Sequence, residues 1–557
     1  MSACAVARVW RRGELCERGI RLRRASEDGH RVKWTLGILV LAAGVFLLHA
    51  LHFRAYFHGY AVDDAYISFR YARNLLDGHG LVFNPGDRIE GYSNFLWVLA
   101  MAPFMRAGGN PALWAQLIAV ACSVATLILV DHALTRMFSV QDRALRLFAL
   151  LLLSGSGYFA GWSISGLETN AFALLLLAAW VRLLVEALAP TPRWPLSALL
   201  LVVLALLRPE GVFLALGAVI ARVWVRRRRL GRVESWRRLA VFALIVCVAL
   251  MAYELWRCGY YGPHWLSNSV RAKVGGGLQQ FLSGLRYVWR FFLIPYLPLL
   301  LAFLFAYGRW RGAGTTPSAM PDASPARGAA ALVAGSGVVL SLGYLLFVAA
   351  VGGDWSYGRL FVPVLPVTVV TAVGLAGSSP RFARWTGTPR RRLVLGILAL
   401  GYLGWAWEVT SRQREAARWE AWWKVDSERI TMGKTFAEIM PKDAVVAVYA
   451  AGQIPYFSGL RAHDMLGLND AYIGGLSMPG MGHGVPGHEK WNARYTLEVV
   501  KPDIIVEGRL IPGLEDHPLR RRDYHRIEGF SKYQEVFFHR RIVEYLQSTG
   551  KLPQNRR

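Results

Sequence analysis

Long apolar runs alternate with short charged segments from residue 34 to residue 409. Eleven of these runs are candidate membrane spans, although several are shorter than the roughly 20 residues that an upright helical span needs. The candidate spans are residues 34–51, 113–134, 147–162, 170–188, 194–207, 211–225, 239–256, 287–307, 329–351, 360–375 and 393–409. Residues 208–211, Arg-Pro-Glu-Gly, separate two short runs. A charged break of this kind predicts a tight turn at one membrane face, or half-helices that line a cavity.

Arginine-rich loops orient the spans, because cytoplasmic loops of membrane proteins carry an excess of Lys and Arg. Such loops lie at residues 136–146, 222–238, 309–327 and 381–392. With these loops in the cytoplasm, the spans alternate consistently, and the basic head, residues 1–33, is also cytoplasmic. The first run then acts as an uncleaved signal anchor. The apolar segment 95–105 would invert this order as a full span, so we expect it to be re-entrant or interfacial.

The chain changes character after the last apolar run. Residues 443–449 and 501–506 read as buried strands, and residues 412–440 have helical periodicity. A second helix is expected within 523–547. The sequence therefore predicts a polytopic α-helical membrane protein with a C-terminal soluble α/β domain. The expected parts are the head, 1–33, a membrane domain, 34–409, with an outer loop at 53–95, and an extracytoplasmic domain, 410–557.

Composition supports a membrane protein and argues against several other classes. Hydrophobic residues make up 54% of the 557 residues, which is too apolar for an ordinary soluble enzyme. The formal net charge of +27 comes with no nucleic-acid-binding motif, so we expect no nucleic acid partner. The five cysteines form no CxxC pair and imply neither a disulfide framework nor a zinc site. No Walker loop, GxGxxG, HExxH or GxSxG motif is present.

Two adjacent carboxylates, Asp63 and Asp64, follow the first span by about a dozen residues. Adjacent like charges repel unless cations or hydrogen bonds offset them, and Arg70 lies close enough along a helix to do so. One interpretation is a solvated loop in which an aspartate caps a helix that runs to about Leu76. The other is a general base held at the membrane surface.

Further ionisable residues flank or interrupt the apolar runs at the same predicted outer face. They are Glu90, Glu168, Arg208, Glu210, Lys273, Asp354 and Arg359. An ionisable side chain in or near the membrane is energetically costly, so such a residue is a candidate for a functional site. Any single one of them could instead mark a helix end. As a set with the aspartate pair, they favour a site at the outer face.

Three segments of the first outer loop carry a family resemblance: DDAYISFRYARN (63–74), GHGLVFN (78–84) and EGYSNFLW (90–97). Further segments agree in order, namely 165–169, 208–211, 268–273, 352–359, 452–460, 464–470 and 487–490. Together they resemble GT-C membrane glycosyltransferases, and in particular the terminal β-arabinofuranosyltransferases of the mycobacterial cell wall. The resemblance covers most of residues 60–510.

The resemblance implies an inverting transfer of a sugar, arabinofuranose by the family match, from a polyprenyl-phosphate donor to a cell-envelope glycan at the outer face of the bacterial inner membrane. Asp64 or Asp63 would be the general base, and Lys273, Arg208 and Arg359 would hold the donor phosphate. Candidate substrate-binding residues are Arg70, Glu90, Glu168, Glu210, Asp354, His463, Asp464 and His488. The last three could equally be structural polar groups. We expect no cofactor, and no residue pattern in the sequence indicates a divalent metal.

Three alternatives stay open at the level of the sequence. The first is a GT-C transferase that moves another lipid-linked pentose or hexose to lipopolysaccharide or protein. The second is a transporter of lipid-linked saccharides, which should show repeats in its two halves. The third is an envelope or flagellar assembly factor that has kept the fold without catalysis. The sequence shows no such repeat, and the aspartate pair is intact.

Overall fold

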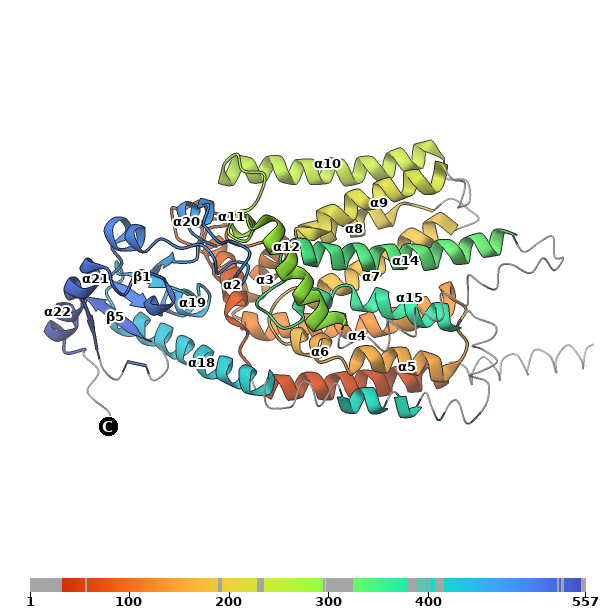
Figure 1. Ribbon diagram of the computed structural model, residues 1–557, viewed down its shortest axis with the longest axis horizontal. Coiled ribbons are helices and arrows are strands. Elements are labelled where there is room, and N and C mark those ends of the chain that lie inside the picture. The colour runs from red at the N-terminus through yellow and green to blue at the C-terminus, as the bar shows by residue number, and fades with distance from the viewer. Residues whose placement is uncertain are drawn as a thin grey trace, which may run out of the picture.

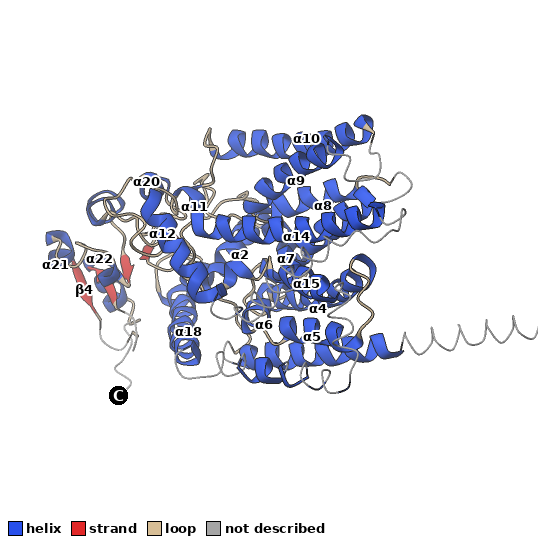
Figure 2. Ribbon diagram, turned by 45° about the vertical axis from the view of Figure 1, so that its right-hand side comes forward, coloured by secondary structure: helices blue, strands red, loops and turns tan. Residues whose placement is uncertain are grey.

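A computed structural model shows the chain as a bundle of long helices with a smaller tail at one end (Figure 1). The structure describes residues 33–55, 58–188, 193–227, 235–293, 296, 324–377, 389, 393, 396–398, 400–405, 415–527, 530–531 and 535–551. Strands are confined to the tail, and the rest of the described chain is helical or loop (Figure 2).

Five helices of the described residues are long and apolar enough to cross a membrane. They are Lys33–Ala55, α4 (Pro111–Met137), α7 (Thr169–Leu188), α10 (Trp236–Tyr261) and the Leu332–Ala350 part of α14 (Ser324–Ala350). The bent pair α5 (Arg143–Ser154) and α6 (Gly157–Ser163) makes a sixth if it counts as one span. A helix rises about 1.5 Å per residue, so about 20 residues cross the hydrocarbon core. The chain is therefore a multi-span helical membrane protein.

Shorter apolar helices complete the bundle. They are α3 (Phe95–Arg106), α8 (Leu196–Leu207) and α15 (Leu365–Gly377), and α8 packs on α9 (Glu210–Arg227). Arg208 is extended, with φ −154° and ψ 146°. Proline disfavours helical geometry in the residue before it, so Pro209 explains why α8 stops there. The expected break at 208–211 is confirmed.

The predicted span 147–162 is bent, because α5 and α6 meet at an angle of 55°, and that the pair makes one span stays a prediction. Gly155 ends α5, and the Ser156 hydroxyl caps α6 by accepting from Phe159 N at 3.4 Å. The predicted span 287–307 lies largely outside the described residues, whereas residues 393, 396–398 and 400–405 of the predicted span 393–409 are described and helical. Within the described part of the first, α12 (Gly277–Val288) ends and the π-helix η1 (Trp289–Leu293) follows. The count of eleven spans therefore stays a prediction.

The tail is a small mixed α/β unit around a five-stranded sheet of order β2-β1-β3-β5-β4. Its elements are α18 (Glu415–Ile439), β1 (Val445–Val448), α19 (Gln453–Ser458), β2 (Arg461–Asp464), α20 (Ala471–Gly475), η5 (Tyr495–Val500), β3 (Ile504–Val506), η6 (Gly508–Leu510), α21 (Pro518–Asp523), β4 (Tyr524–Arg526), β5 (Val536–His539) and α22 (Arg540–Ser548). The strands expected at 443–449 and 501–506 are confirmed as β1 and β3, and the helices expected at 412–440 and within 523–547 correspond to α18 and α22.

Strand β1 lies at the centre of the parallel part of the sheet. Val446 is in register with Ala462 of β2 and with Ile504 of β3, and both pairings are parallel. β3-β5 and β5-β4 are antiparallel. Parallel strands need a crossover of about a dozen residues, and the segment with α19 provides it between β1 and β2. That crossover brings α19 to the membrane domain.

A layer of short elements lies where the bundle meets the tail. It contains α2 (Asp63–Leu76), α11 (Asn268–Arg271), α12 and the 3₁₀ turn η4 (Arg359–Phe361). In Figure 1, α12 runs obliquely across the end of the long helices, on the side of the tail. The predicted outer-face residues are distributed over this layer and the loops next to it.

Candidate active site

Asp63 and Asp64 are the first two residues of α2. The helix ends at Leu76 as expected, but its N-cap is Val62, which makes no side-chain cap, so the capping interpretation is wrong. Val62 N donates to Ser165 O at 3.0 Å, and this contact seats the start of α2 on the turn before α7. Gly166 of that turn has φ +86°, and a Cβ there would overlap the Cβ of Ala61. Acidic residues in the first turn also suit the helix dipole.

The side chain of Asp63 is buried and faces the tail. Its Oδ1 accepts from Gln453 N at 2.8 Å and its Oδ2 from Gly452 N at 2.9 Å. Burial raises the pKa of Asp63 to about 6, against the opposing charge of Arg429 and the two amides. Both oxygens of Asp63 therefore already have backbone donors.

The side chain of Asp64 keeps 28% of its surface exposed and faces the membrane domain. Its Oδ2 lies 3.6 Å from Nη1 of Arg359, whose Nη2 lies 2.7 Å from Oδ2 of Asp354. The Ser356 hydroxyl also donates to Asp354, at 2.7 Å. The pKa of Asp354 is lowered, because burial, which would raise it, is outweighed by Arg359 and Lys273. Asp64 is thus an accessible carboxylate beside a buried ion pair.

Lys273 belongs to the same cluster. Burial lowers its pKa, and the charges that act on it come from Asp354, Arg359 and Asp64. Its stem packs against the tail, since a Cβ on Gly487 would lie 3.2 Å from Lys273 Cε. Arg359 therefore places one cation beside Asp64, and Lys273 adds a second positive charge that acts on the same carboxylates. We name Asp64, Lys273, Asp354 and Arg359 the junction cluster.

Arg208 lies between two carboxylates instead. Its Nη1 is 2.6 Å from Glu168 and its Nε is 2.5 Å from Glu210. Asn94 donates to the other oxygen of Glu168 at 2.7 Å, and Ser68 of α2 donates to Asn94 at 3.0 Å. Of the three predicted phosphate-binding cations, Lys273 and Arg359 are in the junction cluster, while Arg208 is neutralised by a flanking network that reaches α2.

The tail contributes one aromatic ring and an imidazole to the same region, where the imidazole faces a tryptophan of the membrane domain. The ring of His488 lies 5.6 Å from that of Tyr449 and 6.3 Å from that of Trp355. Burial lowers the pKa of His488, with Asp64, Lys273 and Asp354 among the charges that act on it. His488 was expected from the sequence. Tyr449 and Trp355 were missed, although Trp355 follows Asp354 directly and could have been found on that signal.

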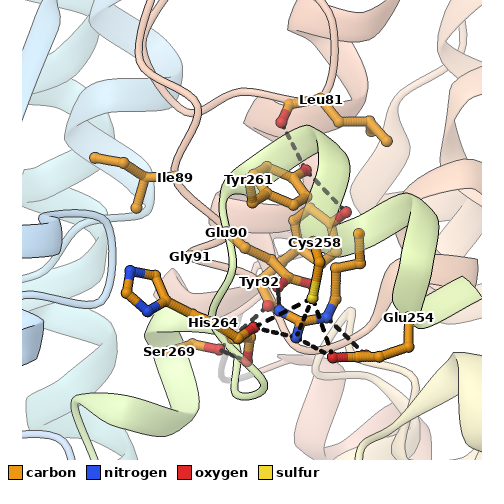
Figure 3. A network of polar contacts seen from close by, with 12 residues as sticks. Leu81, Ile89, Glu90, Gly91, Tyr92, Glu254, Cys258, Tyr261, His264 and Ser269 are labelled. Carbon is orange, nitrogen blue, oxygen red and sulfur yellow. Dashed lines mark hydrogen bonds and ion pairs between the residues drawn. The ribbon is translucent and has the colours of Figure 1, made fainter.

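Glu90 lies in a separate polar network (Figure 3). Its Oε2 accepts from Arg257 at 2.8 Å, and Arg257 also pairs with Glu254. Ser269 joins the network through its amide, which donates to Glu90 O at 3.3 Å. Burial raises the pKa of Glu90 to about 7, against the hydrogen bond from Arg257. This network connects the loop between α2 and α3 to the segment that carries Lys273.

The predicted residues Arg70, His463 and Asp464 make their contacts elsewhere, either between the membrane domain and the tail or within the tail. Arg70 donates to backbone oxygens of Phe83, Pro455 and Leu460. In β2, His463 lies 3.0 Å from Thr496 Oγ1 and 3.3 Å from Asp470, while Asp464 accepts from the amides of Leu466 and Asn469. The structure therefore gives these residues protein partners away from the junction cluster.

The sequence of this chain is similar to those of two known glycosyltransferases. The chain is 28% identical to the terminal β-(1→2)-arabinofuranosyltransferase of Mycobacterium tuberculosis over 387 residues, which are 63% of this chain and 58% of that protein. It is 27% identical to the enzyme of the same name from Corynebacterium glutamicum over 370 residues, 60% of this chain and 51% of that protein. The chain thus spans little more than half the length of these relatives.

Solved structures show the same architecture. ArnT from Cupriavidus metallidurans, bound to undecaprenyl phosphate, superimposes with a TM-score of 0.52 at 12% identity, covering 90% of this chain and 98% of ArnT. Residues 417–547, nearly the whole tail, match a family described as a domain of unknown function, DUF8728. The likeness to ArnT establishes the fold, and the tail family carries no assigned activity.

Proposed function

We propose that this chain, a distant homologue of the terminal β-(1→2)-arabinofuranosyltransferases with a GT-C fold, is an inverting glycosyltransferase. It would transfer arabinofuranose from a polyprenyl-phosphate donor to a hydroxyl of a cell-envelope glycan. One observation carries the proposal: the accessible carboxylate of Asp64 lies 3.6 Å from the buried guanidinium of Arg359, and the charge of Lys273 acts on the same carboxylate. A base beside a phosphate-binding group is what such a transfer requires.

The reaction needs one base and one site for the leaving group. Asp64 takes the proton of the acceptor hydroxyl while the hydroxyl oxygen attacks the anomeric carbon. The bond from that carbon to the phosphate oxygen breaks on the opposite face, and the electron pair leaves with the polyprenyl phosphate. Lys273 and Arg359 offset the charge that develops on this phosphate, and fixed cations in a poorly solvated place do so most effectively. The new glycosidic bond has inverted configuration.

Asp64 is a better candidate for the base than Asp63. A general base must reach the proton that it takes, and Asp63 is buried whereas Asp64 is accessible. Both oxygens of Asp63 accept backbone amide hydrogens, and its side chain faces away from Arg359. The rings of Tyr449 and His488 from the tail and of Trp355 from the membrane domain then offer surfaces on which a sugar ring could stack.

The topology fits this chemistry. We place the head and the arginine-rich loops in the cytoplasm of a bacterial inner membrane, with eleven spans in 34–409 and with the outer loop 53–95 and the tail 410–557 outside. A lipid-linked donor is held in the membrane and needs no nucleotide-binding motif. The solved structure of ArnT contains undecaprenyl phosphate, which supports a polyprenyl-phosphate donor for a chain of the same fold.

Transfer assays on purified protein test the proposal. We would incubate the wild type, Asp64→Asn and Asp77→Asn with polyprenyl-phosphoryl-arabinose and an arabinan oligosaccharide, and follow the product by mass spectrometry. Asp77 is the exposed C-cap of the same helix and serves as the matched control. Removal of a general base should lower the rate about 10²–10⁴-fold, while Asp77→Asn stays at the wild-type rate.

Each outcome is informative. An inactive wild type would exclude this donor and direct the search to other lipid-linked pentoses or hexoses. A folded Asp64→Asn variant with wild-type activity would refute the mechanism at its centre.

A further inference from the structure

Two segments that are far apart in the sequence meet at the carboxylate of Asp63. Asp63 starts α2 of the membrane domain, and the amides of Gly452 and Gln453, about 390 residues later, donate to its two oxygens. Gly452 has no room for a side chain, because a Cβ there would collide with the carbonyl oxygen of Asp63. The fit therefore depends on a carboxylate on one side and a bare backbone on the other.

The tail surrounds Asp63 with further charge. Arg429 of α18 acts on Asp63 and lies 3.1 Å from Asp426 and 2.8 Å from Glu507. A buried carboxylate without partners would be costly, so these tail groups stabilise the ionised Asp63 where it is. Removal of the tail's contacts would leave that carboxylate buried and unpaired.

One stripe of α2 faces α19 along its length. After Asp63 come Tyr66, whose ring lies 5.1 Å from that of Tyr456, and Arg70, which donates to Leu460 O at 2.7 Å. Arg73 follows and donates to Tyr456 O at 2.7 Å. The intervals of three, four and three residues define one helical face.

Asp64 leaves α2 about 100° from this stripe, because successive residues of a helix turn by that angle. The direction of Asp64 toward Arg359 is therefore set by how firmly the neighbouring stripe is held by the tail.

We propose that Asp63 is a positioning residue, which holds α2 against the Gly452–Gln453 backbone of the tail and so sets the direction of Asp64 for proton transfer. The inference rests on the proposed function. It gives the tail a mechanical role in the reaction: the tail fixes the orientation of a base that belongs to the membrane domain. A rotation of α2 would move Asp64 by ångströms, and a misplacement of about 1 Å can cost about 10²-fold in rate.

Kinetics separate positioning from binding. Asp63→Asn keeps the shape but puts an NH₂ group against an amide N–H, so one of the two hydrogen bonds is lost. We expect kcat to fall about 10–100-fold with the donor KM within about threefold of wild type. Gly452→Ala should reproduce this split from the tail side, and Asp63→Glu, which keeps both acceptors, should recover part of kcat.

The matched control is Asp87→Asn. Asp87 pairs with Arg461 of the tail at 2.6 Å, so it also connects the outer loop to the tail, but it does not touch α2. It should leave kcat unchanged. A kcat loss in Asp87→Asn as large as in Asp63→Asn would show that any weakening of the interface has this effect, and would overturn the specific role of Asp63.

Hydrogen exchange gives a readout that needs no substrate. In Asp63→Asn and Gly452→Ala, the amides of 60–68 and 450–458 should exchange at least about tenfold faster, while those of β1 stay protected. Unchanged exchange, or faster exchange at wild-type kcat, would overturn the proposal. If the wild type proved inactive with every donor, the proposed function would fail, and the hydrogen-exchange experiment would still show whether Asp63 holds the tail against the membrane domain.

If Asp63→Asn did not fold, the kinetics and hydrogen exchange of Gly452→Ala and Asp63→Glu would decide whether Asp63 has this positioning role.

Discussion

Asp63 and Asp64 are neighbours in sequence, yet their carboxylates have different surroundings. One is enclosed by backbone amides of the tail, and the other keeps part of its surface exposed beside Arg359. Arg359 in turn joins two carboxylates, Asp64 at 3.6 Å and Asp354 at 2.7 Å. A planar guanidinium can span both, whereas an ammonium is a single point charge. At this scale the geometry of the charge matters as much as its sign.

Arg359→Lys tests this point. The charge is kept, but one of the two contacts is lost, so we expect kcat/KM for the lipid-linked donor to fall about 10–100-fold, which corresponds to about 1.4–2.7 kcal/mol of transition-state stabilisation. Steady-state transfer kinetics measure the change. Arg541→Lys, a half-exposed arginine on the outer side of the tail sheet, is the control and should stay at the wild-type value. Equal kinetics for Arg359→Lys and wild type would exclude Arg359 from the phosphate site.

At the scale of elements, α12 connects two of the three segments that carry the junction cluster, the one with Lys273 and the one with Asp354 and Arg359. Gln280 donates to Lys273 O and to Val351 O, both at 2.9 Å, and the Tyr287 hydroxyl donates to Ser356 O at 2.7 Å. The opposite face of α12 exposes Leu278, Leu282 and Leu285, and Trp289 at the start of η1 is exposed as well. Gly284 on the inner face lies against Ala349 of α14, and a Cβ there would collide with the Ala349 carbonyl.

Gly284→Ala should therefore force α12 away from α14. Overpacking of this kind typically costs about 1–3 kcal/mol, and it would also displace Lys273 relative to Asp64. We expect a melting temperature lowered by several degrees and a reduced transfer rate. Gly343→Ala on α14 is the matched control, since a Cβ there meets open space. A Gly284→Ala protein as stable as Gly343→Ala would show that the helix pair can relax without cost.

Some secondary-structure elements could be predicted from the sequence and others could not. The strands β1 and β3 were predictable because their runs of Val and Ile are buried on both faces. Strand β2, Arg461–Asp464, has no such run, and only its pairing with β1 makes it a strand. The bend between α5 and α6 was missed, although Ser154, Gly155 and Ser156 lie at the break.

The site was predictable where it depends on the pattern of side chains along the sequence, and not where it depends on backbone contacts. Charged residues beside apolar runs are visible in a sequence, and Asp64, Lys273, Asp354 and Arg359 were all expected at one face. The contact of Asp63 with Gly452 and Gln453 was not predictable, because backbone amides about 390 residues away leave no pattern of side chains. The same holds for Asp426 and Arg429, which look like an ordinary pair on a helix.

At the scale of the whole molecule, the tail is attached to the membrane domain by polar contacts. Asn84 of the outer loop pairs with both the amide and the carbonyl of Ala462, at 3.0 and 2.9 Å. Asn268 donates to the carbonyls of Gly467 and Leu468, at 2.8 and 2.9 Å. A specific polar interface holds two parts in one relative orientation better than an apolar one, because each unpaired group would be penalised. This attachment includes buried carboxylates that titrate near neutral pH.

The acid dependence of stability follows from those carboxylates. Burial raises the pKa of Asp426 to about 7 and that of Asp63 to about 6, and the groups that face them are Arg429, Gln453 and, through Arg429, Glu507. Because the folded protein binds these protons more tightly than the unfolded chain, the contribution of these two carboxylates to stability is least favourable above pH 7 and improves as the pH falls through 7 and 6. For Asp426 the gain between pH 8 and pH 6 is about 1 kcal/mol, or a few degrees in melting temperature.

Melting temperatures at pH 6 and pH 8 check this gain. In Asp426→Asn the gain should shrink by more than half, because the group that takes up the proton is gone. Other titrating groups, such as histidines, contribute equally to both proteins, so the difference between the two gains isolates Asp426. Asp516→Asn, which removes an exposed carboxylate on the far side of the tail, should keep the wild-type gain. An Asp426→Asn protein with the full wild-type gain would mean that Asp426 is ionised throughout this range, and that Arg429 outweighs its burial.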